Sequence, residues 1–145
     1  MAVITHADVT YKIIGCAMNV HNALGPGLRE GMYQRALAGE LDRAGLIHEE
    51  EYAVEVALGG YPIGLLYLDH LVEGSVIVEL KALRHRITND EIGQVVTYLA
   101  ATGHGVAILL NFGGKSLEYR RILPPCKLNE WKTRIRRYVW NPPGP

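Results

Sequence analysis

The sequence lacks the features that mark membrane proteins, secreted proteins and cysteine-based metal sites. No apolar run approaches the roughly 20 residues of a membrane helix, and the N-terminus has no basic start and reaches an acid at Asp8, unlike a signal peptide. Cys16 and Cys126 do not have the spacing of a metal site. We therefore expect a reduced, cytoplasmic protein without a membrane segment.

The sequence also has no excess of positive or negative charge. Fifteen basic and fifteen acidic residues give a net charge of zero, which excludes the profile of a strong non-specific nucleic-acid binder. Any nucleic-acid surface must therefore be local. Two basic stretches are candidates: Lys81, Arg84, His85 and Arg86, and the C-terminal Lys127, Lys132, Arg134, Arg136 and Arg137. The second stretch is equally compatible with a solvated helix face.

What is present suits one folded domain. The chain has 145 residues, of which 48% are apolar and 21% charged, enough for a substantial core. We expect a single domain over residues 1–140, followed by a disordered tail over residues 141–145.

Hydrophobic periodicity, caps and turns divide this domain into helices and strands. The expected helices are 8–24, 29–44, 89–102 and an amphipathic 128–139, and the expected strands are 50–58, 63–72, 75–83, 106–110 and 116–123. The first three strands form an antiparallel meander, and a helix then leads to a buried strand of parallel type. The prediction is an α/β fold with a mixed sheet. The second strand is apolar on both faces, which predicts a central position covered on both sides.

Three charged side chains interrupt the apolar hairpin over residues 68–81: Asp69, Glu79 and Lys81. Burying an unpaired carboxylate costs roughly several kcal/mol, so these residues need a common explanation. The simplest is a shared site around a divalent cation. The alternative is a structural ion pair at a sheet edge.

The register of the hairpin decides whether the three charges can meet. Glu79 and Lys81 share a face because side chains alternate along a strand. A three-residue turn over residues 73–75 pairs Asp69 with Glu79, whereas a two-residue turn puts Asp69 on the wrong face. The longer turn needs a left-handed residue, which Gly74 can supply. We therefore predict the three-residue turn.

Carboxylates with this spacing suit Mg²⁺, which binds one or two of them together with waters and phosphates. Asp69 and Glu79 are the predicted ligands, and the carbonyl of Leu80 can add a third. Lys81 is placed to hold an attacking water and to offset charge in a transition state. Glu30, in the first turn of the second helix, can bind the same metal or a second one, although a first-turn acid is also favourable by itself.

Further candidates surround this group. Gln94 can orient the nucleophile or a phosphate, and Tyr98, four residues later on the same helix face, can stack or donate a hydrogen bond. Tyr33 shares a helix face with Glu30 and packs beside it. The six histidines have no metal-ligand pattern.

Several ordered blocks resemble the GxxExxY protein family. They are residues 20–27 (VHNALGPG), 27–33 (GLREGMY), 77–81 (IVELK), 94–98 (QVVTY) and 109–113 (LLNFG), and the resemblance covers residues 9–123. This family is placed in the PD-(D/E)xK nuclease-like superfamily. The resemblance implies a restriction-endonuclease-like fold with an α-β-β-β-α-β core, to which this chain adds an N-terminal helix and a C-terminal amphipathic helix.

The resemblance also implies roles for residues. Asp69 matches the motif aspartate, Glu79 and Lys81 the E-x-K pair, and Glu30 the helical acid. Gln94 with Tyr98 is similar to the Q-x-x-x-Y motif of RecB-type nucleases. Leu68 stands where the superfamily name has proline, and the C-terminal helix matches nothing in the family.

Three functions are compatible with these patterns. The first is an Mg²⁺- or Mn²⁺-dependent nuclease acting on DNA rather than RNA, with Tyr33, Tyr98, Arg84 and Arg86 contacting the substrate. The second is a noncatalytic module that binds nucleic acid or a nucleotide. The third is protein interaction or homo-oligomerisation through the aromatic and basic C-terminal helix, which carries Trp131, Tyr138 and Trp140.

Overall fold

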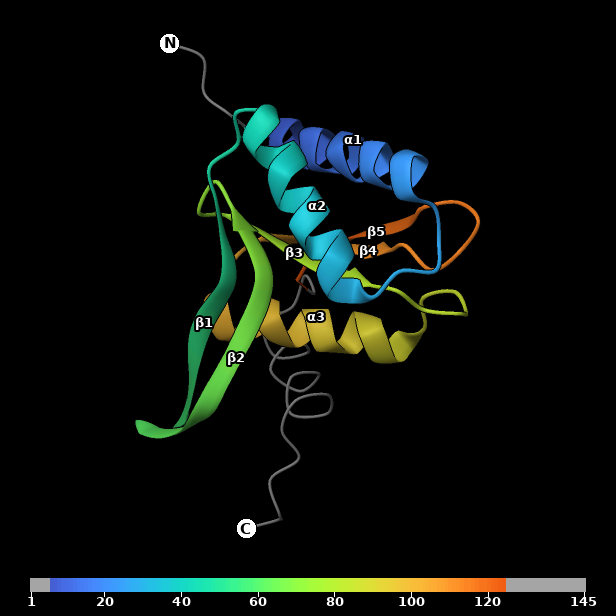
Figure 1. Ribbon diagram of the computed structural model, residues 1–145. Helices are drawn as coiled ribbons and strands as arrows, with labels where there is room; N and C mark the ends of the chain where they lie inside the picture. Colours follow the sequence, from blue (N-terminus) through green and yellow to red (C-terminus); the bar gives the residue numbers. More distant parts are fainter. Residues whose placement is uncertain (1–5, 125–145) are drawn as a thin grey trace.

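A five-stranded mixed sheet separates two layers of helix in the computed structural model, which describes residues 6–124 (Figure 1). The helices are α1 (His6–Leu24), α2 (Glu30–Arg43) and α3 (Asn89–Thr102). The strands are β1 (His48–Leu58), β2 (Tyr61–Val72), β3 (Val76–Lys81), β4 (Val106–Asn111) and β5 (Glu118–Ile122), and they lie in this order across the sheet.

The strand directions confirm the predicted mixed sheet. β1, β2 and β3 form an antiparallel meander, α3 then connects β3 to the parallel β4, and β5 returns antiparallel at the edge. The α-β-β-β-α-β order from α2 to β4 is that of the predicted restriction-endonuclease-like core. The predicted helix over residues 128–139 and the tail after it lie outside the described residues.

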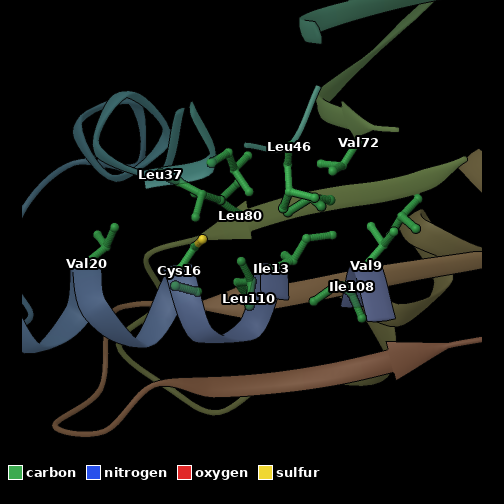
Figure 2. Close-up of a cluster of buried hydrophobic side chains, with 14 of the residues drawn as sticks. Val9, Ile13, Cys16, Val20, Leu37, Leu46, Val72, Leu80, Ile108 and Leu110 are labelled. Atoms are coloured by element: carbon green, nitrogen blue, oxygen red, sulfur yellow. The ribbon is translucent and has the colours of Figure 1, made fainter. Parts of the chain in front are cut away.

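One face of the sheet packs against α1 and α2 (Figure 2). Val9, Ile13, Ala17 and Val20 recur every three or four residues of α1, so they form a single stripe on that helix. Figure 2 shows Ile13 of α1 near Leu110 and Val9 of α1 near Ile108, with Leu37 of α2 close to Leu80 of β3.

The opposite face packs against α3. Val95 and Leu99 of this helix are fully buried in a second cluster with residues of β2, β3 and β4. The helix begins with a capping box, in which the Thr88 side chain accepts from the backbone of the first turn and Glu91 accepts from the N–H of Thr88. Gly103 ends the helix in a left-handed conformation.

The prediction that helices cover β2 on both sides is wrong for its first half. Only residues 68 and 70–72 of this strand are buried, whereas most residues from Tyr61 to Tyr67 are exposed. Figure 1 shows the β1–β2 hairpin extending beyond the helices. A helix of 14 residues such as α3 spans about 21 Å, whereas the 12 residues of β2 span about 40 Å, so the strand is longer than its cover.

None of the helices in the described part of the chain combines the length and the apolar character that crossing a membrane requires.

Candidate functional site

Asp69 and Glu79 lie side by side where β2 separates from β3. Backbone pairing between these strands ends at His70 and Val78, and the two carboxylates continue the contact. The N–H of Asp69 donates to Oε1 of Glu79 at 3.1 Å, and the N–H of Leu80 donates to Oδ2 of Asp69 at 2.8 Å. Side chains thus take the place of backbone carbonyls, and the acids are built into the sheet.

The predicted three-residue turn produces this register. Val72 pairs with Val76 across residues 73–75, which confirms the prediction. Gly74 has the expected left-handed backbone, with φ of 63°, and Glu73 shares it with φ of 52°. The second left-handed residue was not predicted, because glutamate has no intrinsic preference for that conformation.

The two carboxylates are short of positive charge. Glu79 is only 4% exposed, and burial, followed by the charge of Asp69, raises its pKa to about 9. Burial also raises the pKa of Asp69, against the opposing effect of the hydrogen bond from Leu80. A buried pair of this kind becomes fully ionised only when a cation joins it.

Lys81 is the cation of the site. It follows Glu79 by two residues on the same face of β3 and is half-buried. Its charge lowers the pKa of each of the three acids Glu30, Asp69 and Glu79. No carboxylate of residues 6–124 forms a direct ion pair with it, so its ammonium group is open to a ligand.

Glu30 belongs to the helix layer formed by α1 and α2, on the face of the sheet opposite α3. It is the first residue of α2, after a turn in which Gly25 and Gly27 have positive φ. Loss of hydration raises the pKa of Glu30, Lys81 lowers it and Asp69 raises it. The structure therefore places Glu30 within electrostatic reach of Asp69 and Lys81, and its role as a metal ligand stays a prediction.

Glu51 is a fourth acid that the sequence did not reveal. It lies in the middle of β1 with a left-handed backbone, φ of 49°, and pairing with β2 is interrupted there, opposite Asp69. The buried amide of Gln34 donates to Oε1 of Glu51 at 3.0 Å and to the carbonyl of Asp69 at 3.3 Å. Glu51 raises the pKa of both Asp69 and Glu30. Three consecutive acids in β1 were the only sequence signal.

The predicted contact of Tyr33 with a substrate is wrong. Its side chain is fully buried and stacks on Phe112 with a ring-centroid distance of 4.7 Å. Its hydroxyl accepts from the N–H of Leu28 at 3.1 Å and donates to the carbonyl of Gly25 at 2.6 Å. Tyr33 therefore holds the turn that precedes α2, and with it the position of Glu30.

Gln94 and Tyr98 reach the site from α3. Gln94 is exposed and Tyr98 is buried, and the side chain of Gln94 is near enough to lower the pKa of Tyr98. Burial raises the pKa of Tyr98, and the charges of Glu79 and Asp69 raise it further. Tyr98 thus lies near the carboxylates but beneath the surface, whereas Gln94 is open to a ligand.

Arg84 and Arg86 lie in the loop between β3 and α3. Both are exposed, and Arg86 lies 3.6 Å from a carboxylate oxygen of Glu118. The loop is fixed to the sheet by the buried side chain of Asn111, which donates to the carbonyl of His85 at 3.0 Å. Two guanidinium groups are therefore held on the segment that directly follows Lys81.

The donor set fits a hard divalent cation that retains water. Among residues 6–124, no three His, Cys, Asp or Glu side chains converge closely enough to hold a metal ion as they stand. Asp69 and Glu79 alone supply two carboxylates, which is the number Mg²⁺ commonly takes from a protein. Leu80 is fully buried, and its N–H bonds to Asp69; a role for its carbonyl stays a prediction.

Comparison with known sequences gives one family. The model of the PD-(D/E)XK nuclease superfamily matches residues 7–122, which contain every predicted site residue. No curated protein matches significantly.

Comparison with solved structures gives the same type of fold. The crystal structure of SSO0001 is similar with a TM-score of 0.58 and 18% identity, over 75% of this chain and 56% of that one. This chain thus spans little more than half the length of SSO0001. The alkaline exonuclease LHK-Exo from Laribacter hongkongensis has a TM-score of 0.54 and 15% identity, over 97% of this chain and 81% of that one. Its complex with dAMP has a TM-score of 0.51 and 16% identity, over 94% and 80%.

Proposed function

Because the chain belongs to the PD-(D/E)XK nuclease superfamily, we propose that it is a metal-dependent nuclease that cleaves phosphodiester bonds at the site of Asp69, Glu79 and Lys81. The observation that carries the proposal is the adjacency of the two acids, in which Glu79 accepts from the N–H of Asp69 and Asp69 accepts from the N–H of Leu80. We further propose that the chain belongs to the GxxExxY family within this superfamily, because residues 27–33 and 77–81 resemble two of the sequence blocks of that family.

The metal is Mg²⁺ or Mn²⁺, held by Asp69 and Glu79 with help from the Leu80 carbonyl and Glu30. When bound, such an ion polarises a phosphoryl oxygen and lowers the pKa of a water molecule. Asp69 and Glu79 keep a fixed orientation because the backbone of β2 and β3 holds one oxygen of each. Preorganisation of this kind is what electrostatic catalysis requires.

Lys81 orients the attacking water and offsets the negative charge that develops on the scissile phosphate. Its ammonium is suited to this because no described carboxylate pairs with it. Gln94 positions the phosphate or the water from the other side, next to the buried Tyr98 of the same helix. Arg84 and Arg86 bind phosphates that flank the scissile bond, because guanidinium groups form paired hydrogen bonds with phosphate oxygens.

The substrate is DNA rather than RNA. Support for a nucleic-acid substrate comes from the superfamily, and support for DNA comes from the similar alkaline exonuclease, which was crystallised with dAMP. The basic residues near Lys81 are few, so the site can neutralise few phosphates. We therefore expect binding to be local rather than extended and to weaken only gradually with salt.

The proposal is tested by incubating the full chain with linear, circular and single-stranded DNA and with RNA, in Mg²⁺, in Mn²⁺ and in excess chelator. Cleavage should require the cation and fall by about 100-fold or more in Lys81→Ala and Asp69→Asn. The matched control is Lys115→Ala, an exposed lysine in the β4–β5 connection, which should cleave like the wild type.

Two results would reject the nuclease. Equal cleavage by the two site variants and the wild type would show that the activity lies elsewhere. DNA binding without cleavage in every cation would replace the nuclease with a noncatalytic nucleic-acid-binding module.

A further inference from the structure

The outer half of the β1–β2 hairpin carries an uncovered apolar strip. Its members are Tyr61, Ile63, Leu65 and Tyr67, which are between 47% and 75% exposed. They alternate along β2 and therefore lie on one face. Single exposed apolar residues are normal, but a contiguous row on one strand marks an interaction surface.

This strip faces away from α3. Leu66 and Leu68 pack in the cluster on the α3 side of the sheet, so the alternate residues point to the opposite face. On the neighbouring strand, Ala53 pairs with Tyr67 and Glu55 pairs with Leu65, and both β1 residues are exposed. The face is thus apolar along β2 and carries an acid from β1.

All the Asp, Glu, Lys and Arg residues of the β1–β2 hairpin and its flanking segments are acidic. Residues 44–80 contain no lysine or arginine, and their charged members are Glu49, Glu50, Glu51, Glu55, Asp69, Glu73 and Glu79. The opposite composition occurs in residues 126–140, whose charged members are Lys127, Glu130, Lys132, Arg134, Arg136 and Arg137. The same segment has an apolar stripe at helical spacing, with Leu128, Trp131, Ile135 and Tyr138.

We propose that residues 126–140 of the same chain dock on this hairpin face. The apolar stripe covers Leu65 and Tyr67, and the basic residues of the segment lie against the glutamates of β1. The match is one of both hydrophobicity and charge, and complementary charge fixes the orientation of such a contact. Docking there brings the most basic part of the chain beside a site that carries four acids.

The segment is long enough to reach the face. Ile122 pairs with Ala107, which pairs with Ile77, which pairs with Leu71, so three strand spacings of about 4.8 Å separate Ile122 from β2. Tyr67 lies four residues farther along β2, or about 13 Å, which gives a diagonal of about 20 Å. The six residues from Ile122 to Leu128, where the stripe at helical spacing begins, span up to about 21 Å when extended.

Other occupants fit the face less well. A second copy that paired its own β1 with this one would bring glutamates against glutamates, because each β1 strand carries four acids and no lysine or arginine. A nucleic acid that stacked on Tyr61 and Tyr67 would place its phosphates against the same acids.

Tryptophan fluorescence of the full chain tests the proposal directly, because the two tryptophans of the protein, Trp131 and Trp140, both lie in the segment. We expect blue-shifted emission and weak acrylamide quenching in the wild type. Leu65→Lys and Tyr67→Lys should shift the emission to the red and increase quenching. Tyr11→Lys, which changes an 81% exposed tyrosine on α1, is the matched control and should leave both unchanged.

Each alternative result overturns the proposal. Wild-type emission equal to that of the urea-unfolded chain means that the segment is not docked. Blue-shifted emission that is the same in Leu65→Lys and Tyr67→Lys as in the wild type means that the segment docks elsewhere. A blue shift that appears only as concentration rises, with a dimer in size-exclusion chromatography, assigns the face to a second copy. Circular dichroism of each variant confirms that the hairpin substitutions leave the fold intact.

Discussion

Asp69 and Glu79 are joined by main-chain hydrogen bonds of the strands that carry them, the N–H of Asp69 donating to Glu79 and the N–H of Leu80 to Asp69. The same two carboxylates have raised pKa values because the sheet buries them. The same pair of carboxylates therefore helps to hold β2 against β3 and also carries the unusual charge state of the site.

The stability of the metal-free protein should fall as pH rises. The pKa of Glu79 is 4.5 in an ordinary environment and about 9 in the fold, so the native state binds the extra proton between these values. The contribution of this proton to the free energy of unfolding is complete below pH 4.5 and is lost progressively up to about pH 9. Urea unfolding in chelator should show this slope, which Glu79→Gln should flatten.

The buried His70 makes stability rise with pH, and it does so in a lower pH range than Glu79. Burial, followed by the proximity of His48, lowers the pKa of His70 from 6.5 to about 4, so its contribution is lost as pH falls through that range. Measurements above pH 6.5 therefore exclude the contribution of His70 and report on the carboxylates of the site, of which Glu79 has a pKa raised to about 9. A stability that rises or stays level from pH 6.5 to 9 in the wild type would contradict the assignment.

Binding of a divalent cation should release a proton. Because Glu79 is protonated at neutral pH and a ligand carboxylate must be ionised, calorimetry in two buffers of different ionisation enthalpy should report about one proton per Mg²⁺ or Mn²⁺. Glu79→Gln should remove the release and weaken binding, whereas Glu73→Gln, in the turn of the same hairpin, should change neither. Binding without proton release would place the cation elsewhere.

Gly113 should not tolerate a side chain. A Cβ at this position would overlap the backbone carbonyl of Leu83, at the base of the loop that carries Arg84 and Arg86. We expect Gly113→Ala to destabilise the fold by about 3 kcal/mol or more.

Gly15 provides the control for that substitution. Nothing lies within 4 Å of a Cβ built at Gly15, in the interior of α1, so Gly15→Ala should stabilise the protein by about 0.5–1 kcal/mol. Denaturant midpoints of the two variants should therefore move in opposite directions. An unchanged midpoint for Gly113→Ala would mean that the loop shifts freely.

Removing the hydroxyl of Tyr33 should make the turn that precedes α2 more mobile. Tyr33→Phe keeps the stacking on Phe112 and loses the bonds to Gly25 and Leu28, at a cost of about 1–3 kcal/mol. Hydrogen exchange should increase over residues 25–30, and any nuclease activity should fall because Glu30 follows this turn.

The comparison variant is Tyr11→Phe, which removes the hydroxyl of an 81% exposed tyrosine and should alter neither stability nor exchange. If Tyr33→Phe were as stable as the wild type, the turn would be held by other contacts.

Much of the fold could be predicted because its signals are local. The α1 stripe, the Thr88 capping box and Gly103 each specify an element within a few residues of sequence. The meeting of Asp69 with Glu79 could also be predicted, since a turn of known length fixes the register of the strands on either side.

The remaining features depend on contacts that sequence spacing does not encode. Glu51 joins the site because Gln34, from another element, bonds it in a left-handed conformation. Tyr33 shares a helix face with Glu30, yet the end of α2 lies at the surface while the next turn lies in the core. The exposure of Leu65 follows because α1 and α2, on its side of the sheet, cover only the end of β2 at Val72, which the sequence of the strand alone does not reveal.

The bonds between the site acids and the sheet also bear on how the protein changes over evolutionary time. A lineage that lost its activity would still need the acceptors that Asp69 and Glu79 present to the N–H groups of β2 and β3. Selection on folding alone would then preserve acids, or amides of the same shape, at these positions. In such descendants, Lys81 and Gln94 should diverge first, because neither side chain supports the sheet.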